Sequence, residues 1–160
     1  MNTTLNSSPL VDFDIRISNA SSELMLILKS VLADTNELFL KSNNLTEVLI
    51  GPAYSEVRAD VDCCCTELSN TLPMFYEAMS KTNIEASQVA CSINWFTSPK
   101  YAGWIDRVRE LTSIHQKIRM TILDVFMNFN ETDFLIVFKY LKVRLAIHEK
   151  YLWNLRTHIS

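Results

Sequence analysis

Two stretches of the sequence, WIDRVRELTSIHQKIRMTILDVFMNF (residues 104–129) and FLIVFKYLKVRLAIHEKYLWNLRTHI (residues 134–159), decide the fold. In each stretch apolar residues recur at intervals of three and four, which is the spacing of one face of an α-helix. If the chain reverses between them, the two apolar faces oppose each other, and the position numbers of every opposing pair have the same sum. The pairs are Trp104 with Ile159, Leu111 with Leu152, His115 with His148, Ile122 with Leu141 and Phe129 with Phe134. We therefore expect an antiparallel helical hairpin with arms about 38 Å long.

Helical spacing continues through the first part of the chain. Apolar stripes predict one helix over residues 21–41 and another over residues 54–72. Pro73 disrupts a helix that precedes it, so residues 74–81 should form a kinked continuation or a separate short helix. Residues 134–147 are apolar on nearly every side, which indicates that the last helix is central and that the others wrap around it. The expected fold class is all-α: a four- to five-helix bundle with a long C-terminal antiparallel hairpin.

Capping signals mark where further helices should begin. Residues 44–47 and residues 82–85 both have the spacing of a capping box. They predict a short helix that ends at Gly51 and a longer third helix later in the chain. The caps expected for the two arms of the hairpin are Ser98-Pro99 for the first arm, and Asn130 with Thr132 for the second.

The segment of residues 10–17 has the strict alternation of a β-strand. Its apolar positions are Val11, Phe13, Ile15 and Ile17. A lone strand has no ladder partner within this chain, which leaves two interpretations: an arm laid over the helices, or a strand that pairs with another molecule by strand addition. We therefore divide the chain into an extended arm of residues 1–18 and a single helical-bundle domain of residues 19–160.

Composition and motifs argue against catalysis. The chain of 160 residues has only two glycines and four prolines, too few for a phosphate-binding loop or a dinucleotide fingerprint. His-Glu-x-x-His, Glu-x-x-His and nucleophile-elbow spacings are all missing from the sequence. We expect neither an enzyme nor a cofactor. The first residues lack the pattern of a secretory signal and no apolar run approaches ~18 residues, so a cytoplasmic location is expected.

The cysteines and histidines do not predict a metal site. Three of the four cysteines are consecutive, with no CxxC spacing, and cannot converge on one ion. His115 should face His148, but neither has a third ligand at helical spacing. We interpret the pair as hydrogen-bonded core histidines; the alternative is that their joint protonation loosens the hairpin at acid pH. The cysteines are Cys63, Cys64, Cys65 and Cys91; the second and third should be buried and the first exposed, where it could also accept a lipid.

Charge is divided unevenly along the chain. Residues 1–99 carry five Lys and Arg against twelve Asp and Glu, a net charge of −7, whereas residues 100–160 carry ten against six, a net charge of +4. One explanation is complementarity between the two parts of the fold. The other is a binding face for an acidic protein or for lipid headgroups. The residues of that candidate face are Lys139, Lys142, Lys150, Trp153 and Arg156. Nucleic acid is not an expected partner, because the sequence pI is about 5.6.

Two segments resemble the fungal HeLo and HeLo-like domains, the helical-bundle modules at the N-terminus of NLR-type and cell-death proteins. They are VDCCCTELSNTL (residues 61–72), similar to the cysteine-containing second helix of that family, and Trp95 followed by IDRVRELTSIHQKIRMTI (residues 105–122), similar to a later helix. The family usually begins with an apolar helix that engages membranes, whereas residues 1–20 here are polar and then strand-like. The resemblance implies a signalling module that acts by self-association or membrane contact.

The sequence therefore predicts a non-enzymatic helical bundle that works by binding. The first hypothesis is a protein-interaction or signalling domain acting through self-association, a protein partner or a membrane surface. The alternative is a structural or assembly subunit, joined to other copies through the N-terminal arm and the basic face. A third possibility is a carrier of apolar ligands in the bundle core.

Overall fold

The computed structural model describes residues 9–81 and 103–160, with side chains described for residues 18–80 and 103–160. The described chain consists of helices joined by short turns and contains no strand, which confirms the all-α class. The elements are α1 (Pro9–Thr46), the 3₁₀-helix η1 (Pro52–Tyr54), α2 (Ser55–Asn70), α3 (Leu72–Lys81), α4 (Trp104–Asn128) and α5 (Leu135–Thr157).

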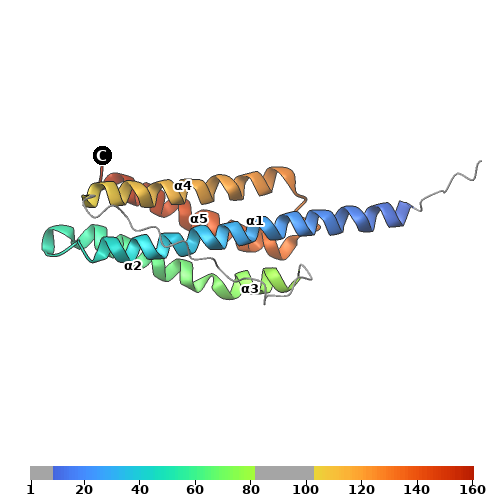
Figure 1. The fold of residues 1–160 in the computed structure, drawn as a ribbon, viewed down its shortest axis with the longest axis horizontal. Coiled ribbons are helices and arrows are strands. Elements are labelled where there is room, and N and C mark those ends of the chain that lie inside the picture. Colours follow the sequence, from blue (N-terminus) through green and yellow to red (C-terminus); the bar gives the residue numbers. More distant parts are fainter. Residues whose placement is uncertain (1–8, 82–102) are drawn as a thin grey trace, which may run out of the picture.

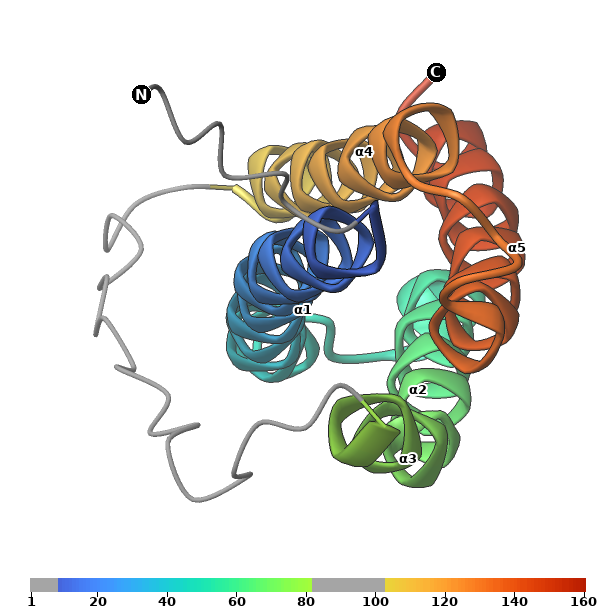
Figure 2. The same ribbon diagram turned by 90° about the vertical axis from the view of Figure 1, so that its right-hand side faces the viewer.

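The helices form a four-helix bundle along one long axis (Figure 1). Seen from its end, the bundle has four positions: α1, α4, α5, and α2 continued by α3 (Figure 2). Helix α1 packs against α4 and α2, whereas α5 packs against α4, α2 and α3. The expected bundle is confirmed, but α5 occupies a corner of it rather than the centre. Its outer side, which includes Leu135 and Val143, is exposed.

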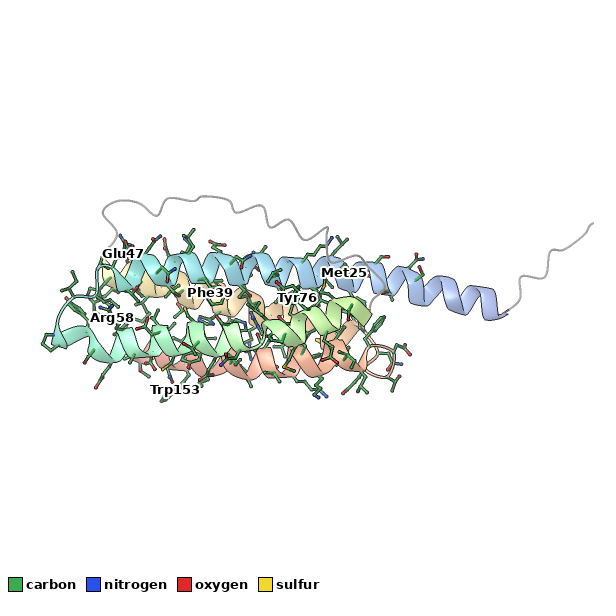
Figure 3. The ribbon with its side chains drawn as sticks, turned by 90° about the horizontal axis from the view of Figure 1, so that it is seen from below. Met25, Phe39, Glu47, Arg58, Tyr76 and Trp153 are labelled. Carbon is green, nitrogen blue, oxygen red and sulfur yellow. The ribbon has the colours of Figure 1, made fainter. Side chains whose placement is uncertain are left out.

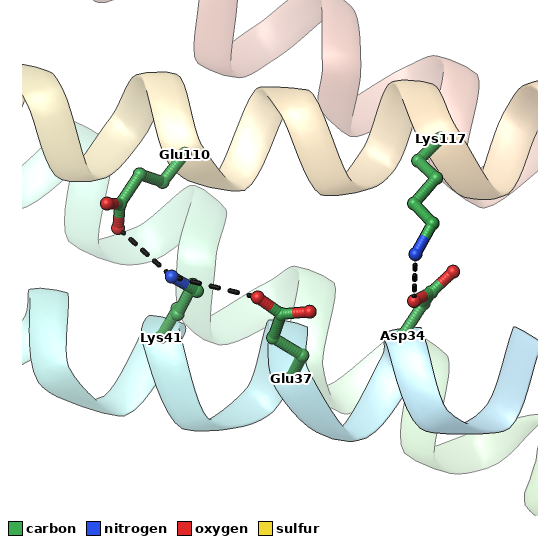
Figure 4. Close-up of polar contacts among 5 residues, drawn as sticks. All are labelled: Asp34, Glu37, Lys41, Glu110 and Lys117. Carbon is green, nitrogen blue, oxygen red and sulfur yellow. Dashed lines mark hydrogen bonds and ion pairs between the residues drawn. The ribbon is translucent and has the colours of Figure 1, made fainter. Parts of the chain in front are cut away.

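Ion pairs between α1 and α4 show how neighbouring helices are aligned. Lys41 Nζ lies 3.4 Å from Glu110 Oε2 and 3.7 Å from Glu37 Oε1, and Lys117 Nζ lies 2.7 Å from Asp34 Oδ1 (Figure 4). Moving seven residues forward from Glu110 to Lys117 on α4 corresponds to moving seven residues back from Lys41 to Asp34 on α1. The two helices are therefore antiparallel.

The C-terminal hairpin has the register that the sequence predicts. His115 Nδ1 of α4 lies 2.8 Å from His148 Nδ1 of α5. At the turn, the rings of Phe129 and Phe134 are 6.2 Å apart and meet edge to face. Both pairs are among the opposing pairs predicted from the sequence, whose position numbers have the same sum. The apolar periodicity of the two stretches therefore identified the partner of each helix as well as its buried face.

The core runs along the centre of the bundle between the four positions. Every position supplies side chains with no exposed surface, among them Leu28 of α1, Leu68 of α2, Ile122 of α4 and Leu141 of α5. Burying a side chain of this size contributes about 1.5–3 kcal/mol. The apolar stripes predicted for the two arms of the hairpin and for residues 54–72 are thus the surfaces that hold the bundle together.

Pro73 separates two helices at one position of the bundle. Helix α2 ends at Asn70 and α3 begins at Leu72, with Thr71 at the junction. The Thr71 hydroxyl donates a hydrogen bond to the carbonyl of Leu68 at 2.7 Å. Of the two predicted outcomes, a kinked continuation or a separate short helix, the chain adopts the second.

The N-terminal strand prediction is wrong. Helix α1 begins at Pro9, so residues 10–17 are helical and α1 runs without a break through residue 18 into the bundle. Adding residues to an existing helix needs no new nucleus, and the helix satisfies its backbone amides internally, which a strand without a partner cannot do. Strand addition by this segment therefore loses its basis, and its four apolar side chains lie outside the described ones. This end of α1 projects beyond the other helices (Figures 1 and 3).

Two predicted helix starts are also wrong. Asn44 opens no new helix, because α1 continues to Thr46 and buries Leu45 on the same face as Leu38. That face keeps the seven-residue spacing of the core stripe, and burial outweighs the local capping signal. Helix α4 begins at Trp104 rather than near Pro99, since the preceding glycine is extended. The predicted third helix, Cys91 and Trp95 lie outside the described residues.

The cap predicted for the last helix stabilises a turn instead. Asn130 Oδ1 accepts hydrogen bonds from the backbone N–H and the hydroxyl of Thr132, at 3.1 and 2.9 Å. Helix α5 starts five residues after Asn130, at Leu135, with no side-chain cap, and ends at Thr157 as predicted.

Candidate functional site

The structure offers two candidate sites, an outward face of α5 and a buried polar layer. Among the described residues, His, Cys, Asp and Glu nowhere gather in a group of three or more that could hold a metal ion. Of the three consecutive cysteines of α2, Cys63 is exposed, Cys64 is buried and Cys65 is intermediate. The exposed Cys63 and the buried Cys64 are as predicted, whereas Cys65, which was expected to be buried, is only partly buried.

The first candidate is the set of side chains predicted to meet a partner, which we call the basic face. Lys139, Lys142, Lys150 and Arg156 are all exposed and lie on the side of α5 that faces away from the core. Trp153 lies among them with 70% of its surface exposed, and Figure 3 shows it at the outer edge of the bundle. The neighbours of Trp153 in the sequence, Leu152 and Leu155, are buried, so the helix turns the indole away from the core.

Two of the four cations of the basic face are paired with carboxylates. Lys150 Nζ lies 2.5 Å from Glu67 Oε1 of α2, and the Tyr151 hydroxyl donates to the same oxygen at 2.7 Å. The hydrogen bond from Lys150, followed by that from Tyr151, lowers the pKa of the Glu67 carboxyl. Lys142 Nζ lies 2.6 Å from Glu131 Oε1 in the turn before α5.

The other two cations have no such neighbour. Within residues 18–80 and 103–160, neither Lys139 nor Arg156 forms an ion pair with a carboxylate. These two cations and the exposed indole of Trp153 are therefore the part of the basic face that the described fold does not use.

The uneven charge of the sequence is explained in part by contacts inside the bundle. Lys150 with Glu67 and Lys117 with Asp34 each join the basic C-terminal part to the acidic N-terminal part. His158 Nε2 also lies 2.7 Å from Asp60 Oδ2. Internal complementarity is therefore present, and the unpaired cations of α5 remain in addition to it.

The second candidate is a layer of polar side chains in the middle of the core, which we call the polar layer. Each member has at most 3% of its surface exposed. The members are Thr35 of α1, Cys64 of α2, Thr71 at the α2–α3 junction, His115 of α4, and Arg144 and His148 of α5.

Arg144 is the centre of the polar layer. Its Nη2 donates to Thr35 Oγ1 at 2.5 Å and to His148 Nε2 at 3.0 Å, and its Nη1 donates to Thr71 Oγ1 at 3.4 Å. Both threonine hydroxyls donate in turn to backbone carbonyls of their own helices. The guanidinium therefore holds side chains from three positions of the bundle.

The donor character of Arg144 fixes the protons of both histidines. A guanidinium can only donate, so His148 Nε2 must be the acceptor and its Nδ1 carries the proton. That N–H donates to His115 Nδ1 at 2.8 Å, which leaves the remaining proton of His115 on Nε2, 3.7 Å from Cys64 Sγ. Both imidazoles are neutral, and the hydrogen bonds run in one direction from Arg144 to Cys64.

Burial sets the charge states in this layer. It lowers the pKa of His115 to about 3, and the charge of Arg144 acts in the same direction. Burial, followed by the charge of Arg144 and by the charge that His115 carries when it is protonated, also lowers the pKa of His148. Burial raises the pKa of the Cys64 thiol, which stays protonated. The layer therefore holds one positive charge, on Arg144.

That charge has no counterion among the described residues. The partners of Arg144 are two hydroxyls, an imidazole and the ring of Tyr140, whose centroid is 6.0 Å from Cζ. Its Nε atom is buried without a hydrogen-bond acceptor. Taking a cation out of water without an anion is costly, and burial accordingly lowers the pKa of Arg144.

The sequence predicted the histidine pair but not its hub. The prediction that His115 and His148 are hydrogen-bonded core residues is confirmed. Arg144, four residues before His148, is one of the residues at helical spacing that offers no metal ligand, and this pattern does not predict its central place in the layer. The signal was nevertheless present, because Arg144 lies on the buried stripe of the last helix, three residues after Leu141 and four before His148.

Comparisons with known proteins do not place the chain in a family: it matches no protein-family model, no curated protein and no solved structure. Over the part of the chain that the structure describes, no helix is long and apolar enough to cross a membrane. What the fold and sites define is a four-helix bundle with a cationic, tryptophan-bearing outer face and a buried arginine layer.

Proposed function

We propose that this chain is a non-enzymatic protein-interaction domain of the signalling kind, which binds an acidic segment of a partner protein through the basic face of α5. The observation that carries the proposal is Trp153, a large indole that is 70% exposed on a well-packed helix. Arg156 lies about one turn away on the same face and Lys139 about 21 Å away along the helix, and neither pairs with a carboxylate among the described residues. The packed core holds α5 in place, so this face is displayed without cost in chain ordering.

The chemistry of the face indicates what kind of partner it takes. Tryptophan and arginine are the side chains that most often dominate binding energy at protein interfaces, because each buries a large surface and also donates hydrogen bonds. The cations around Trp153 attract negative charge and raise the rate of encounter with an acidic partner. An acidic segment with an apolar side chain for the indole fits both features.

The test compares variants of the full chain for binding to a fluorescently labelled peptide of Glu, Asp and Leu, measured by fluorescence anisotropy. Trp153→Ala and Lys139→Glu should each weaken binding about tenfold or more, which corresponds to about 1.4 kcal/mol. The matched controls are Met127→Ala, at a residue with 84% exposure on α4, and Arg109→Glu, an exposed cation of the same helix. Both controls should bind as the unaltered chain does.

Other outcomes would overturn the proposal in identifiable ways. Binding to vesicles that contain phosphatidylserine, without binding to the peptide, would make the face a membrane-contact surface. A mass in solution that rises with concentration, and that Trp153→Ala reduces to the monomer, would make a second copy the partner and the chain an assembly subunit. Equal peptide binding by all four variants would remove the basic face from the function.

A further inference from the structure

The polar layer connects two halves of the bundle. Three of its contacts cross from the α4–α5 hairpin to the helices of the N-terminal half: Arg144 to Thr35, Arg144 to Thr71, and His115 to Cys64. The contact between the two histidines lies within the hairpin. A change that breaks this layer therefore acts first on the boundary between the hairpin and the α1–α2–α3 half.

The layer holds only while both histidines are neutral. His148 Nε2 now accepts a hydrogen bond from Arg144 Nη2 at 3.0 Å. If Nε2 were protonated, two N–H donors and two positive charges would face each other across that distance. A proton on His115 Nδ1 would do the same to the 2.8 Å contact with His148 Nδ1. Each protonation thus replaces a hydrogen bond with a repulsion in a site without water contact.

Among the described residues, the surrounding helices supply no anion that contacts the imidazoles and could offset a second charge. The charge that acts on both imidazoles is that of Arg144, and His115 adds a second charge beside His148 once it is protonated. The groups that contact the layer from the N-terminal half are the two threonine hydroxyls and the neutral thiol of Cys64, and on α5 itself the ring of Tyr140 lies near Arg144.

The acids close in the sequence to the members of the layer are paired with cations. Asp62, two residues before Cys64, pairs with Arg58, and Glu149, beside His148, pairs with Arg119. Asp34, beside Thr35, is held by Lys117, and Glu67, one turn from Cys64, is held by Lys150.

We propose that the polar layer is a proton-operated latch, which releases the α4–α5 hairpin from α1 and α2 when His115 and His148 become protonated. The released form exposes the side chains of the layer and keeps its helices, because the apolar face within the hairpin and the lysine–carboxylate pairs at the surface do not titrate with imidazole.

The direction of the pH dependence follows from the neutral state of the buried pair. The closed form keeps the pKa of both histidines below the value of about 6.5 for exposed imidazole. The open form therefore binds two more protons, so the closed form is most stable above that pH and loses stability as the pH falls below it. One proton changes the ratio of open to closed chains about tenfold per pH unit, and two protons change it about 100-fold.

Cys64 reports the opening directly, because it is a buried member of the layer beside an exposed cysteine. In one reporter chain Cys63, Cys65 and Cys91 are replaced by serine, and in the other Cys64, Cys65 and Cys91 are replaced. Each is treated with 4,4′-dithiodipyridine, which reacts with thiols at acid pH, from pH 7 to pH 5. The ratio of the two labelling rates cancels the intrinsic pH dependence of the reagent and measures the open fraction.

The expected result is a rate ratio that rises about 100-fold between pH 6 and pH 5 while the far-ultraviolet circular dichroism remains helical. Adding His148→Gln or His115→Asn, which keeps a neutral hydrogen-bonding side chain, should reduce the rise to about tenfold. A flat ratio overturns the latch, as does a loss of helical signal in step with labelling, since that shows global unfolding. An unchanged slope in a folded histidine variant also overturns it; if neither variant folds, the slope with both histidines present decides.

Discussion

The α4–α5 hairpin contains two kinds of layer that occupy equivalent positions of one helical pattern. Ile122 and Leu141 form an apolar layer with no exposed surface, whereas His115 and His148 form a polar layer that is equally buried. The apolar layer gains stability from burial alone. The polar layer needs every hydrogen bond to offset the loss of water around Arg144. The two layers are equally buried, but the stability of the apolar layer depends on packing, whereas that of the polar layer depends on its hydrogen bonds.

The difference also assigns different roles to the layers. Apolar side chains of similar size can exchange places with little penalty, so an apolar layer fixes the register only loosely. The polar layer is satisfied in one alignment, in which Arg144 meets Thr35 and Thr71 while His148 meets His115. We interpret the polar layer as an element that selects the register at a cost in stability, and the apolar layers as the source of that stability.

The largest effect should come from the apolar layer. Leu141→Ala should lower the free energy of unfolding by about 2–5 kcal/mol, because the packed surroundings cannot collapse fully around the cavity. Urea unfolding followed by circular dichroism measures the change. Leu135→Ala on the same helix, at a residue with 63% exposure, is the control and should change little. Similar losses for both variants would contradict the corner position of α5.

The next effect should have the opposite sign. Arg144→Met keeps a long side chain in the same space and removes the buried charge, so it should raise the free energy of unfolding by about 1–4 kcal/mol. The substitution also removes the hydrogen-bond donor to His148, which opposes this gain, so we expect an increase near the lower end of that range. Thermal unfolding at neutral pH provides the measurement. A clear destabilisation would mean that the hydrogen bonds of Arg144 outweigh its desolvation, and that the two layers contribute to stability with the same sign.

The smallest effect should come from a single hydrogen bond of the polar layer. Thr35→Val preserves shape and removes the hydroxyl that accepts from Arg144, so it should cost about 1–3 kcal/mol. The same substitution made together with Arg144→Met should cost less, because no buried donor is left unsatisfied. A double-mutant cycle measures the coupling. Equal costs in both backgrounds would show that Thr35 acts by packing alone.

The sequence-based predictions that were confirmed rest on interactions within one helix or between two consecutive helices. The spacing of apolar residues identified the buried stripes and the pairing of His115 with His148, because a helix repeats its faces regularly and an antiparallel hairpin brings those faces together. The same reasoning placed Trp153 and its neighbouring cations on the outer side of α5. These conclusions depend on geometry within one helix or between two consecutive helices.

The wrong predictions share a different cause. Alternation in residues 10–17 is a period-two signal, and residues 44–47 carry a capping signal, but both segments are parts of α1. In each case a neighbouring helix extends through a short local pattern, because continuing the helix satisfies the backbone and, at Leu45, buries a side chain. A short motif does not show whether the segments around it will override it.

The sequence by itself determined the helical class, the hairpin and the face of each arm that is buried, since these follow from periodicity that the chain carries locally. Only the tertiary structure decided that Arg144 lies at the centre of a hydrogen-bonded layer, because its partners come from residues 35, 71 and 148 and become neighbours only when three positions of the bundle meet. The charge states of the two histidines were decided at the same level, since burial and the field of one arginine determine them.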